Sequence, residues 1–159
     1  MTQRRTHLIV LVGIPGSGKT TYAHRLLARC RTMRAISPDL TRERLYPGYE
    51  RGLINHALIN QQRIFGIAYR EVSDALSSGV DVLFDATNLT IARRRRLIRL
   101  AWQHNAVPIA HYFTADIALA LHRNRLRHRR VPTSIIMRMF AILQPPTHTE
   151  GFVRVVTHR

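Results

Sequence analysis

Short aliphatic runs alternate with longer amphipathic segments along the whole chain. The aliphatic runs have the length of strands and favour strands that are buried on both faces. The longer segments repeat apolar residues at intervals of three and four positions, as on one face of a helix. We expect strands at 8–12, 35–37, 80–84, 107–113 and 152–156. We expect helices at 19–30, from 38, at 50–77, from 90, from 114 or 116, and from 133.

This alternation predicts an α/β fold in which a mostly parallel sheet of about five strands is covered by helices on both faces. A length of 159 residues suits one domain, so we expect residues 1–159 to form a single unit. In parallel sheets of this kind, ligands bind beyond the carboxyl ends of the strands. We therefore expect residues 13–20, 37–42 and 85–88 to share one pocket rim.

The turn after the first expected strand carries a phosphate-binding motif. Residues 13–20, Gly-Ile-Pro-Gly-Ser-Gly-Lys-Thr, match G-x-x-x-x-G-K-[ST] between a buried strand and a helix. In such a P-loop, main-chain N–H groups and the helix N-terminus bind phosphate oxygens. Lys19 would reach the outer phosphates, a catalytic role, and the Thr20 hydroxyl can ligate Mg²⁺. The residues expected to bind ATP here are Gly13, Ile14, Pro15, Gly16, Ser17, Gly18, Lys19, Thr20 and Thr21.

The charge balance is strongly basic. Lys+Arg totals 25 against 9 Asp+Glu, which gives a formal net charge of +16. Such a surface favours polyanions such as nucleic acid, although a solvated basic surface has the same composition. Lys19 is the one lysine of the chain, so the N-K-x-D element of guanine-specific enzymes is absent and a GTPase is disfavoured.

The apolar stretches and the cysteine content bear on where the protein resides in the cell. No apolar stretch reaches the ~20 residues that a membrane span needs. Cys30 is the one cysteine, so no intramolecular disulfide can form. We expect a cytoplasmic protein without a membrane or disulfide partner, and the sequence leaves its oligomeric state open.

A kinase also needs a carboxylate near the acceptor hydroxyl. Asp39 follows the second expected strand, and Arg42 lies three residues on, on the same face of a short helix. This pair can take a proton from a hydroxyl and hold a nearby anion. We therefore place Asp39 as the catalytic base and both residues in the acceptor site. A plain helix N-cap is the other interpretation of Asp39.

A second carboxylate, Asp85, ends the third expected strand and resembles a Walker-B acid. We expect it to hold Mg²⁺ with Thr20, through water, or to orient the acceptor, and a strand-end turn residue is the alternative. Thr87 and Asn88 follow it and are candidates for acceptor binding. Capping of the next helix explains these two residues equally well.

Arginines cluster after the fourth expected strand, in a segment expected to form a lid at about 123–132. On a helix, Arg123, Arg127 and Arg130 would share one face. Guanidinium groups there can stabilise charge on a transferring phosphoryl group. We therefore place Arg123 and Arg127 at ATP and give Arg127 a catalytic role. A solvated basic helix end explains the cluster as well.

A second arginine run, Arg93 to Arg96, sweeps most of a helix circumference and cannot form one stripe. We expect Arg93 and Arg94 to be candidates for contacts with strand phosphates. Arg95, Arg96 and Arg99 are expected to be solvated.

Five sequence elements together resemble a known family. They are the P-loop, Ser-x-Asp-x-x-Arg at 37–42, Asp-Ala-Thr-Asn at 85–88, Arg-Asn-x-x-Arg at 123–127 with Val-Pro at 131–132, and Glu-Gly-Phe at 150–152. In this order they look like the 5′-kinase domain of the polynucleotide kinase family, over nearly the whole chain. The resemblance implies that Asp39 is the general base toward a polynucleotide 5′-OH and that Arg42 contacts the neighbouring phosphate. It also implies that Arg123 and Arg127 are lid residues on the donor phosphates. Many relatives carry a phosphatase or ligase domain as well, for which 159 residues leave no room.

We therefore expect an ATP- and Mg²⁺-dependent kinase that phosphorylates 5′-hydroxyl ends of DNA or RNA. One alternative is a P-loop kinase acting on a nucleoside, sugar or antibiotic hydroxyl. Another is a module whose ATP hydrolysis is stimulated by nucleic acid. The sequence does not decide between DNA and RNA, because no motif reveals a contact with a 2′-OH.

Overall fold

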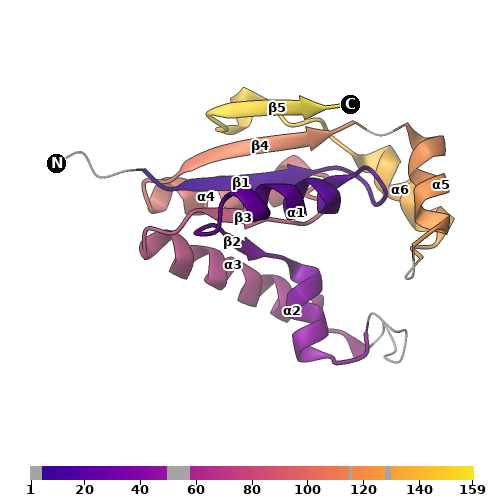
Figure 1. Cartoon of the computed structure of the whole chain (residues 1–159), viewed down its shortest axis with the longest axis horizontal. Helices are drawn as coiled ribbons and strands as arrows, with labels where there is room; N and C mark the ends of the chain where they lie inside the picture. Colours follow the sequence, from indigo (N-terminus) through magenta and orange to yellow (C-terminus); the bar gives the residue numbers. More distant parts are fainter. Residues whose placement is uncertain (1–4, 50–57, 115, 128–129) are drawn as a thin grey trace.

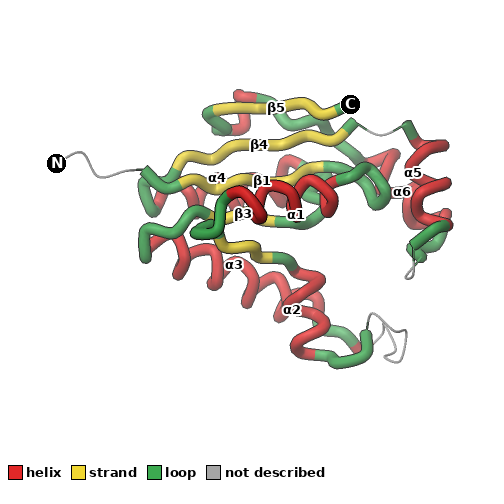
Figure 2. Tube along the Cα trace, viewed as in Figure 1, coloured by secondary structure: helices red, strands yellow, loops and turns green. Residues whose placement is uncertain are grey.

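The structure is a computed structural model that describes residues 5–49, 58–114, 116–127 and 130–159. Strands and helices alternate through most of the chain, as Figures 1 and 2 show. The strands are β1 (His7–Val12), β2 (Arg34–Ile36), β3 (Val82–Phe84), β4 (Val107–Phe113) and β5 (Arg154–His158). The helices are α1 (Lys19–Arg29), α2 (Pro38–Leu45), α3 (Gln61–Ser77), α4 (Ile91–Gln103), α5 (Ile117–Arg125) and α6 (Thr133–Ile142), with a 3₁₀ turn, η2, at His148–Glu150.

The five strands form one sheet in the order β2-β3-β1-β4-β5, and every pair of neighbours is parallel. The predicted α/β fold is therefore confirmed. Because the strands are parallel, the carboxyl ends of β1, β2 and β3 meet at one edge. Figure 1 shows this edge at the end of the molecule where α5 and α6 gather.

Helices cover the sheet on both faces. Val10 and Val12 of β1 pack on the side of α3 and α4. Ile9 and Leu11 alternate with them and pack on the side of α1. Two-sided burial is the reason that β1 is an unbroken aliphatic run rather than an alternating one.

Several element ends differ from the prediction. α3 begins at Gln61, because the Asn60 side chain caps it by accepting a hydrogen bond from the Arg63 N–H. Residues 58–60 are therefore outside the helix expected at 50–77, and Leu58, expected on its apolar stripe, is 72% exposed. The rest of the expected N-terminal part, 50–57, lies outside the described residues.

The last strand begins two residues later than expected. Phe152 was expected in that strand, but it precedes β5 and is buried in the core. α6 begins at Thr133, where a helix was expected, and its N-cap is Pro132. Within the described residues, no helix is both long and apolar enough to cross a membrane.

One arginine prediction is wrong. Arg94 was a candidate for phosphate contacts, but it is fully buried and forms a two-bond ion pair with Glu150, at 2.7 Å for each bond. Its third nitrogen group donates to the Asn88 carbonyl at 2.9 Å. This arginine therefore holds α4, η2 and the loop after β3 together, and it is not available to a ligand.

Candidate active site

Main-chain hydrogen bonds join the three segments expected at the pocket rim. The Gly13 N–H donates to the Thr87 carbonyl at 3.0 Å, which ties the P-loop to the loop after β3. The Asp85 N–H donates to the Ile36 carbonyl at 2.9 Å, which ties that loop to the start of α2. The P-loop, α2 and the 85–88 loop therefore form one continuous edge.

Two glycines give the P-loop its shape. Gly18 caps α1 with φ at 101°, and Gly16 has φ at 84°, both in the left-handed region that favours glycine. A Cβ on Gly16 would lie 2.5 Å from the Ala120 carbonyl oxygen. The loop can therefore pack against α5 because position 16 has no side chain.

The Lys19 side chain is buried inside the P-loop. Its ammonium donates to the Ile14 carbonyl at 2.7 Å and to the Ser17 hydroxyl at 3.3 Å. Burial lowers the pKa of Lys19 from 10.5 to about 8, against the opposing effect of the nearby Asp85 carboxylate. Thr20 and Thr21 follow on the exposed start of α1.

Asp85 is the charged group with the largest effect on the Lys19 pKa, and Lys19 has the largest effect of any charged group on the Asp85 pKa. Burial raises the pKa of Asp85 from its ordinary value, Lys19 opposes this, and Asp39 raises the pKa further. Both carboxylates and the ammonium therefore lie near enough to act on one another electrostatically. Arg127 and His24 also act on Asp85, and both lower its pKa.

His24 was missed in the sequence interpretation. It lies one helical turn after Thr20 on α1, so the two residues share a face. That spacing is the signal that could have found it.

The donor set suits magnesium better than a metal that needs a protein cage. Within the described residues, no group of three or more His, Cys, Asp or Glu side chains could hold a metal ion. Mg²⁺ keeps several waters and binds through one or two carboxylates plus substrate phosphates. The Thr20 hydroxyl and the Asp85 carboxylate, both next to the P-loop, fit that requirement.

Asp39 lies at the start of α2 with its side chain 66% exposed. The N-cap of α2 is Ser37, whose hydroxyl accepts from the Asp39 N–H at 3.2 Å, so the capping interpretation of Asp39 is wrong. Arg42 donates to the Asp39 carboxylate and, at 3.0 Å, to the Gln61 side chain. The guanidinium also lies 5.1 Å from the centre of the Tyr49 ring.

Arg42 is itself nearly buried, with 8% of its surface exposed. Its Nε atom is buried and has no hydrogen-bond partner among the described residues. The geometry gives Arg42 a direct part in positioning Asp39. The bonds to Asp39 and Gln61 use two of the five N–H donors of the guanidinium.

Thr87 and Asn88 do not cap α4, because its N-cap is Thr90. Asn88 is 1% exposed and has φ at 46°, and its amide donates to the Leu11 carbonyl at 2.7 Å. Its side chain therefore fixes the loop to β1. Thr87 is half-buried and lies beside the P-loop, because its carbonyl accepts the hydrogen bond from the Gly13 N–H.

The lid arginines come from the end of α5 and the turn after it. Arg123 donates to the Gly16 carbonyl at 3.4 Å. Arg127 lies close enough to lower the pKa values of Lys19 and Asp85. α5 ends at Arg125, so the expected single helical face through Arg123, Arg127 and Arg130 is wrong.

A cavity of about 390 Å³ opens beside the P-loop, on the side of α5 and the chain terminus. It is bordered by Gly16 and Ser17 of the P-loop, by Thr114, Asp116, Leu119, Ala120 and Arg123, and by Arg159. Its volume lies in the range of small-molecule sites. The sequence interpretation did not find this cavity, because its walls come from three distant segments.

A P-loop after the central strand of a parallel five-stranded sheet, with helices on both faces, defines the P-loop kinase fold. The chain belongs to the AAA domain family AAA_33, which matches residues 8–146.

Among known proteins, the relatives of this chain include kinases whose names refer to different phosphoryl acceptors. The L-seryl-tRNA(Sec) kinase of Methanococcus maripaludis is 24% identical over 143 residues, which cover 87% of this chain and 53% of that protein. The chain thus spans about half the length of this relative.

Solved structures share the fold. A chain of the Pnkp1/Rnl/Hen1 RNA repair complex has a TM-score of 0.75 at 22% identity, covering 90% of this chain and 45% of that chain. A gluconokinase from Sinorhizobium meliloti 1021 has a TM-score of 0.63 at 20% identity, covering 97% of this chain and 83% of that chain.

Proposed function

We propose that the protein is an ATP-dependent kinase that transfers the γ-phosphoryl group to a 5′-hydroxyl end of DNA or RNA. The observation that carries this proposal is the position of Asp39. Its exposed carboxylate lies at the start of α2, on the carboxyl edge of the sheet, and acts electrostatically on Lys19 and Asp85. A carboxylate in that position can receive the proton of an attacking hydroxyl.

Each group on the edge has a part in the transfer. The P-loop amides and Lys19 hold the donor phosphates, and the cavity beside Gly16 has room for the nucleoside of the donor. Arg42 holds the Asp39 carboxylate in position through their hydrogen bond. Arg123 and Arg127 supply positive charge over the transferring group, where charge builds up in the transition state.

Magnesium would be held by the Thr20 hydroxyl and, through water, by Asp85, and it would neutralise charge on the donor phosphates. The acid–base work in this proposal falls to Asp39, which takes the hydroxyl proton as the oxygen attacks phosphorus. The bond between the γ-phosphorus and the β–γ bridging oxygen breaks in line with the new one, and ADP leaves.

Two considerations favour a polynucleotide acceptor. The net charge of +16 draws polyanions to the surface. One relative is named as a kinase of a seryl-tRNA, and another matched chain belongs to an RNA repair complex. The gluconokinase match supports a small-molecule kinase as the second candidate.

Product analysis separates these candidates. The protein is incubated with Mg²⁺ and ATP labelled at the γ-phosphate, together with a 5′-hydroxyl oligonucleotide. The matched control is the same oligonucleotide already phosphorylated at its 5′ end. We expect label at the 5′ terminus of the first oligonucleotide and none on the second.

Other outcomes have distinct meanings. Label on a nucleoside, sugar or antibiotic but never on an oligonucleotide would overturn the proposal in favour of a small-molecule kinase. Free phosphate released in response to oligonucleotide, without labelled product, would point to the ATPase module instead.

A further inference from the structure

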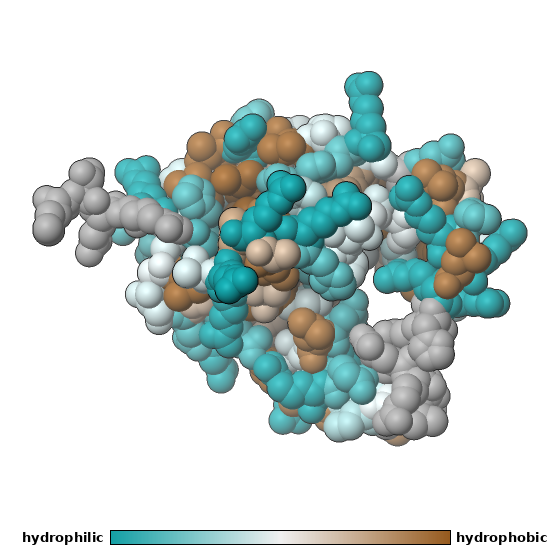
Figure 3. All heavy atoms as spheres, in the orientation of Figure 1, coloured by the Kyte–Doolittle hydropathy of each residue, from teal (hydrophilic) through white to brown (hydrophobic). Residues whose placement is uncertain are grey.

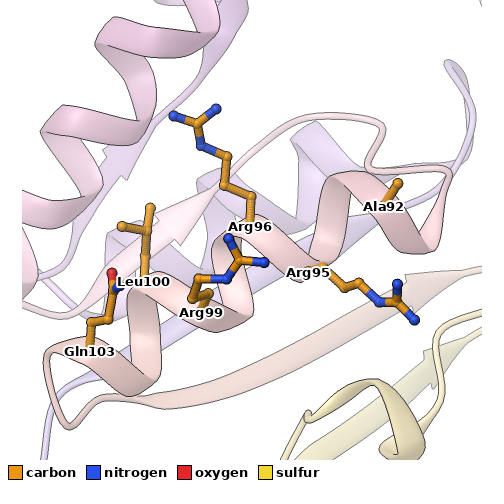
Figure 4. Close-up of a pocket in the computed structure, with 6 residues that line it drawn as sticks. All are labelled: Ala92, Arg95, Arg96, Arg99, Leu100 and Gln103. Atoms are coloured by element: carbon orange, nitrogen blue, oxygen red, sulfur yellow. The ribbon is translucent and has the colours of Figure 1, made fainter.

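The outer face of α4 carries a row of arginines that leads away from the catalytic edge. Arg95, Arg96 and Arg99 line a hollow of about 480 Å³, which we call the α4 groove, together with Ala92, Leu100 and Gln103. Figure 4 shows Arg96 directed toward one side of the helix and Arg95 toward the other, with Arg99 between them. Arg95 and Arg99 are one turn apart, about 6 Å along the helix axis.

An exposed aromatic ring continues this row. Trp102 lies three residues after Arg99 and seven after Arg95, so the three side chains follow one stripe of the helix. The indole is 47% exposed, and its N–H donates to the Gly151 carbonyl at 3.2 Å. The ring is therefore held in place with much of its surface open to solvent.

Among the described residues, the arginines of the groove have no carboxylate partner. Within the described part of the chain, no ion pair joins Arg95, Arg96 or Arg99 to an acidic side chain, in contrast to the paired Arg94 and Arg44. The guanidinium of Arg96 lies 4.4 Å from the centre of the Tyr69 ring, which supports it from the side of α3. The positive charge of the groove is thus free to meet an anion from outside.

The position of these arginines on α4 also favours a bound anion. α4 has no acidic residue in its first turn, and Arg93 to Arg96 fall in its first two turns. Cations near a helix N-terminus oppose the helix dipole, whereas a bound anion there is favourable. Arg95 and Arg96 therefore oppose the dipole of α4, and an anion bound to them would offset that cost.

We propose that the α4 groove and Trp102 bind single-stranded nucleic acid, with the arginines on backbone phosphates and a base stacked on the indole. A row of cations ending in an open aromatic ring is the combination that holds single strands without reading their sequence. An acidic protein would satisfy the arginines but has no base for Trp102. The inference rests on the proposed function only in taking the acceptor strand as the occupant, because α4 begins just after the 85–88 loop.

The first test uses the natural fluorescence of the protein, since Trp102 is its one tryptophan. The protein is titrated, without ATP, with a single-stranded oligonucleotide that already carries a 5′-phosphate and so cannot accept another. We expect indole emission to be quenched with the same Kd that fluorescence anisotropy of a labelled strand gives. Unchanged emission at saturation by anisotropy would overturn the stacking assignment.

The second test removes the arginines. The triple variant Arg95→Gln, Arg96→Gln and Arg99→Gln should bind the strand about tenfold more weakly or worse at low salt. The slope of log K against log salt should fall by about 2, at about 0.7 for each lost phosphate contact. The thermal midpoint should stay equal or rise, because two of the three cations, Arg95 and Arg96, leave the N-terminal half of α4.

A matched control removes the same charge elsewhere. The variant Arg25→Gln, Arg29→Gln and Arg138→Gln loses three exposed arginines from α1 and α6. We expect it to keep most of the affinity and the quenching. An equal loss in both triple variants would overturn the proposal, because overall charge would then explain the binding.

Competition identifies the occupant, and the outcomes separate this inference from the proposed kinase activity. Poly-glutamate that displaces the strand as well as an oligonucleotide of equal charge would overturn nucleic acid in favour of an acidic protein. Quenching and a steep salt slope without any phosphoryl transfer would refute the proposed kinase function but support nucleic-acid binding by the α4 groove. Phosphoryl transfer to a 5′-hydroxyl without quenching of Trp102 would support the proposed kinase function and refute base stacking at the α4 groove.

Discussion

At the scale of single residues, the chemistry of the nucleotide site centres on the Lys19 ammonium. Before a nucleotide binds, it donates to the Ile14 carbonyl and the Ser17 hydroxyl of its own loop. Donor phosphates would replace these partners with charged oxygens, which bind an ammonium more strongly. Burial of the ammonium is the main cause of its lowered pKa.

This pKa gives a pH prediction for stability. The Lys19 pKa is about 8 in the folded chain against 10.5 in the reference state. Between these values the unfolded state binds a proton that the folded state lacks, so the Lys19 contribution makes the nucleotide-free protein more stable as pH rises from 8 to 10.5. Urea unfolding across this range measures the slope. A Lys19→Met variant should lose that contribution, and an unchanged slope in the variant would contradict the assignment.

The same group predicts proton uptake on nucleotide binding. Phosphate next to the ammonium raises its pKa again, so binding above pH 8 should take up a proton at Lys19. Affinity should therefore weaken as pH passes about 8. Calorimetry in two buffers of different ionisation enthalpy counts the proton. Equal uptake at pH 7 and pH 9 would contradict this account.

At the scale of elements, a buried ion pair ties α4 to η2 and, through Arg94, to the loop after β3. Arg94 is fully buried, and the Glu150 side chain is 3% exposed. Glu150 also accepts from the Thr147 N–H at 3.0 Å, and Arg94 supports the Asn88 carbonyl. The Glu-Gly-Phe segment thus has a structural role in holding the pocket rim.

Breaking that pair should destabilise the fold strongly. Arg94→Met leaves the Glu150 carboxylate buried without its partner, so we expect a loss of about 3–5 kcal/mol in the free energy of unfolding. The double variant Arg94→Met, Glu150→Leu should recover part of this loss. Arg44→Gln is the control, because Arg44 pairs with Glu71 at an exposed position worth at most ~1 kcal/mol. Equal losses in the two single variants, measured by urea unfolding, would show that burial does not decide the effect.

The contact between the P-loop and α5 gives a second prediction at this scale. In Gly16→Ala, the new methyl group would meet the Ala120 carbonyl at 2.5 Å and strain a backbone with φ at 84°. We expect nucleotide affinity to fall at least about tenfold, because the loop and α5 must separate.

Gly66→Ala provides the matched control. Gly66 lies inside α3, where a Cβ has nothing within 4 Å. That change should leave nucleotide affinity unaltered and stabilise the protein by about 0.5–1 kcal/mol. Equal nucleotide affinity in the two variants would contradict the role assigned to Gly16.

Local patterns predicted most elements but not their ends. β4 was predicted with its observed bounds, because its mostly apolar segment lies between the polar residues Asn105 and Thr114. The start of α3 was missed, because the helical spacing of apolar residues continues back through Leu58. The helix begins at Gln61 because the Asn60 side chain caps it. Arg94 was misassigned since its partner Glu150 is 56 positions away, which no local pattern reveals.

The site was predictable where a short motif carries it. The P-loop and the residues at the ends of β2 and β3 were placed on one edge by the topology of a parallel sheet. His24 and the cavity beside Gly16 were not found, because they depend on how α1, α5 and the terminus pack. The catalytic roles themselves stay predictions.

At the scale of the whole molecule, the positive charge is widely spread. Figure 3 shows hydrophilic side chains scattered across the face that α1 covers, and the α4 groove lies over the opposite face of the sheet. A net charge of +16 repels itself in the compact state. Salt therefore acts on stability and on binding with opposite signs.

We expect the thermal midpoint to rise between about 50 and about 300 mM salt, because screening relieves this repulsion. Affinity for an oligonucleotide should fall steeply over the same range, since releasing counterions into a more concentrated salt solution gains less free energy. Thermal unfolding and anisotropy in one buffer series measure both. A midpoint that falls with salt, or an oligonucleotide affinity that does not change, would contradict the electrostatic account.

The central claim is that Asp39 receives the proton of a 5′-hydroxyl as it attacks the donor phosphate. The most direct measurement is single-turnover transfer to a 5′-hydroxyl oligonucleotide by Asp39→Asn, with ATP binding measured on the same sample. The control is Asp74→Asn, which changes an exposed carboxylate on α3. We predict that Asp39→Asn binds ATP normally and transfers about 10²–10⁴-fold more slowly, while the control keeps its rate. Transfer by Asp39→Asn at the rate of the unmodified protein would contradict the claim.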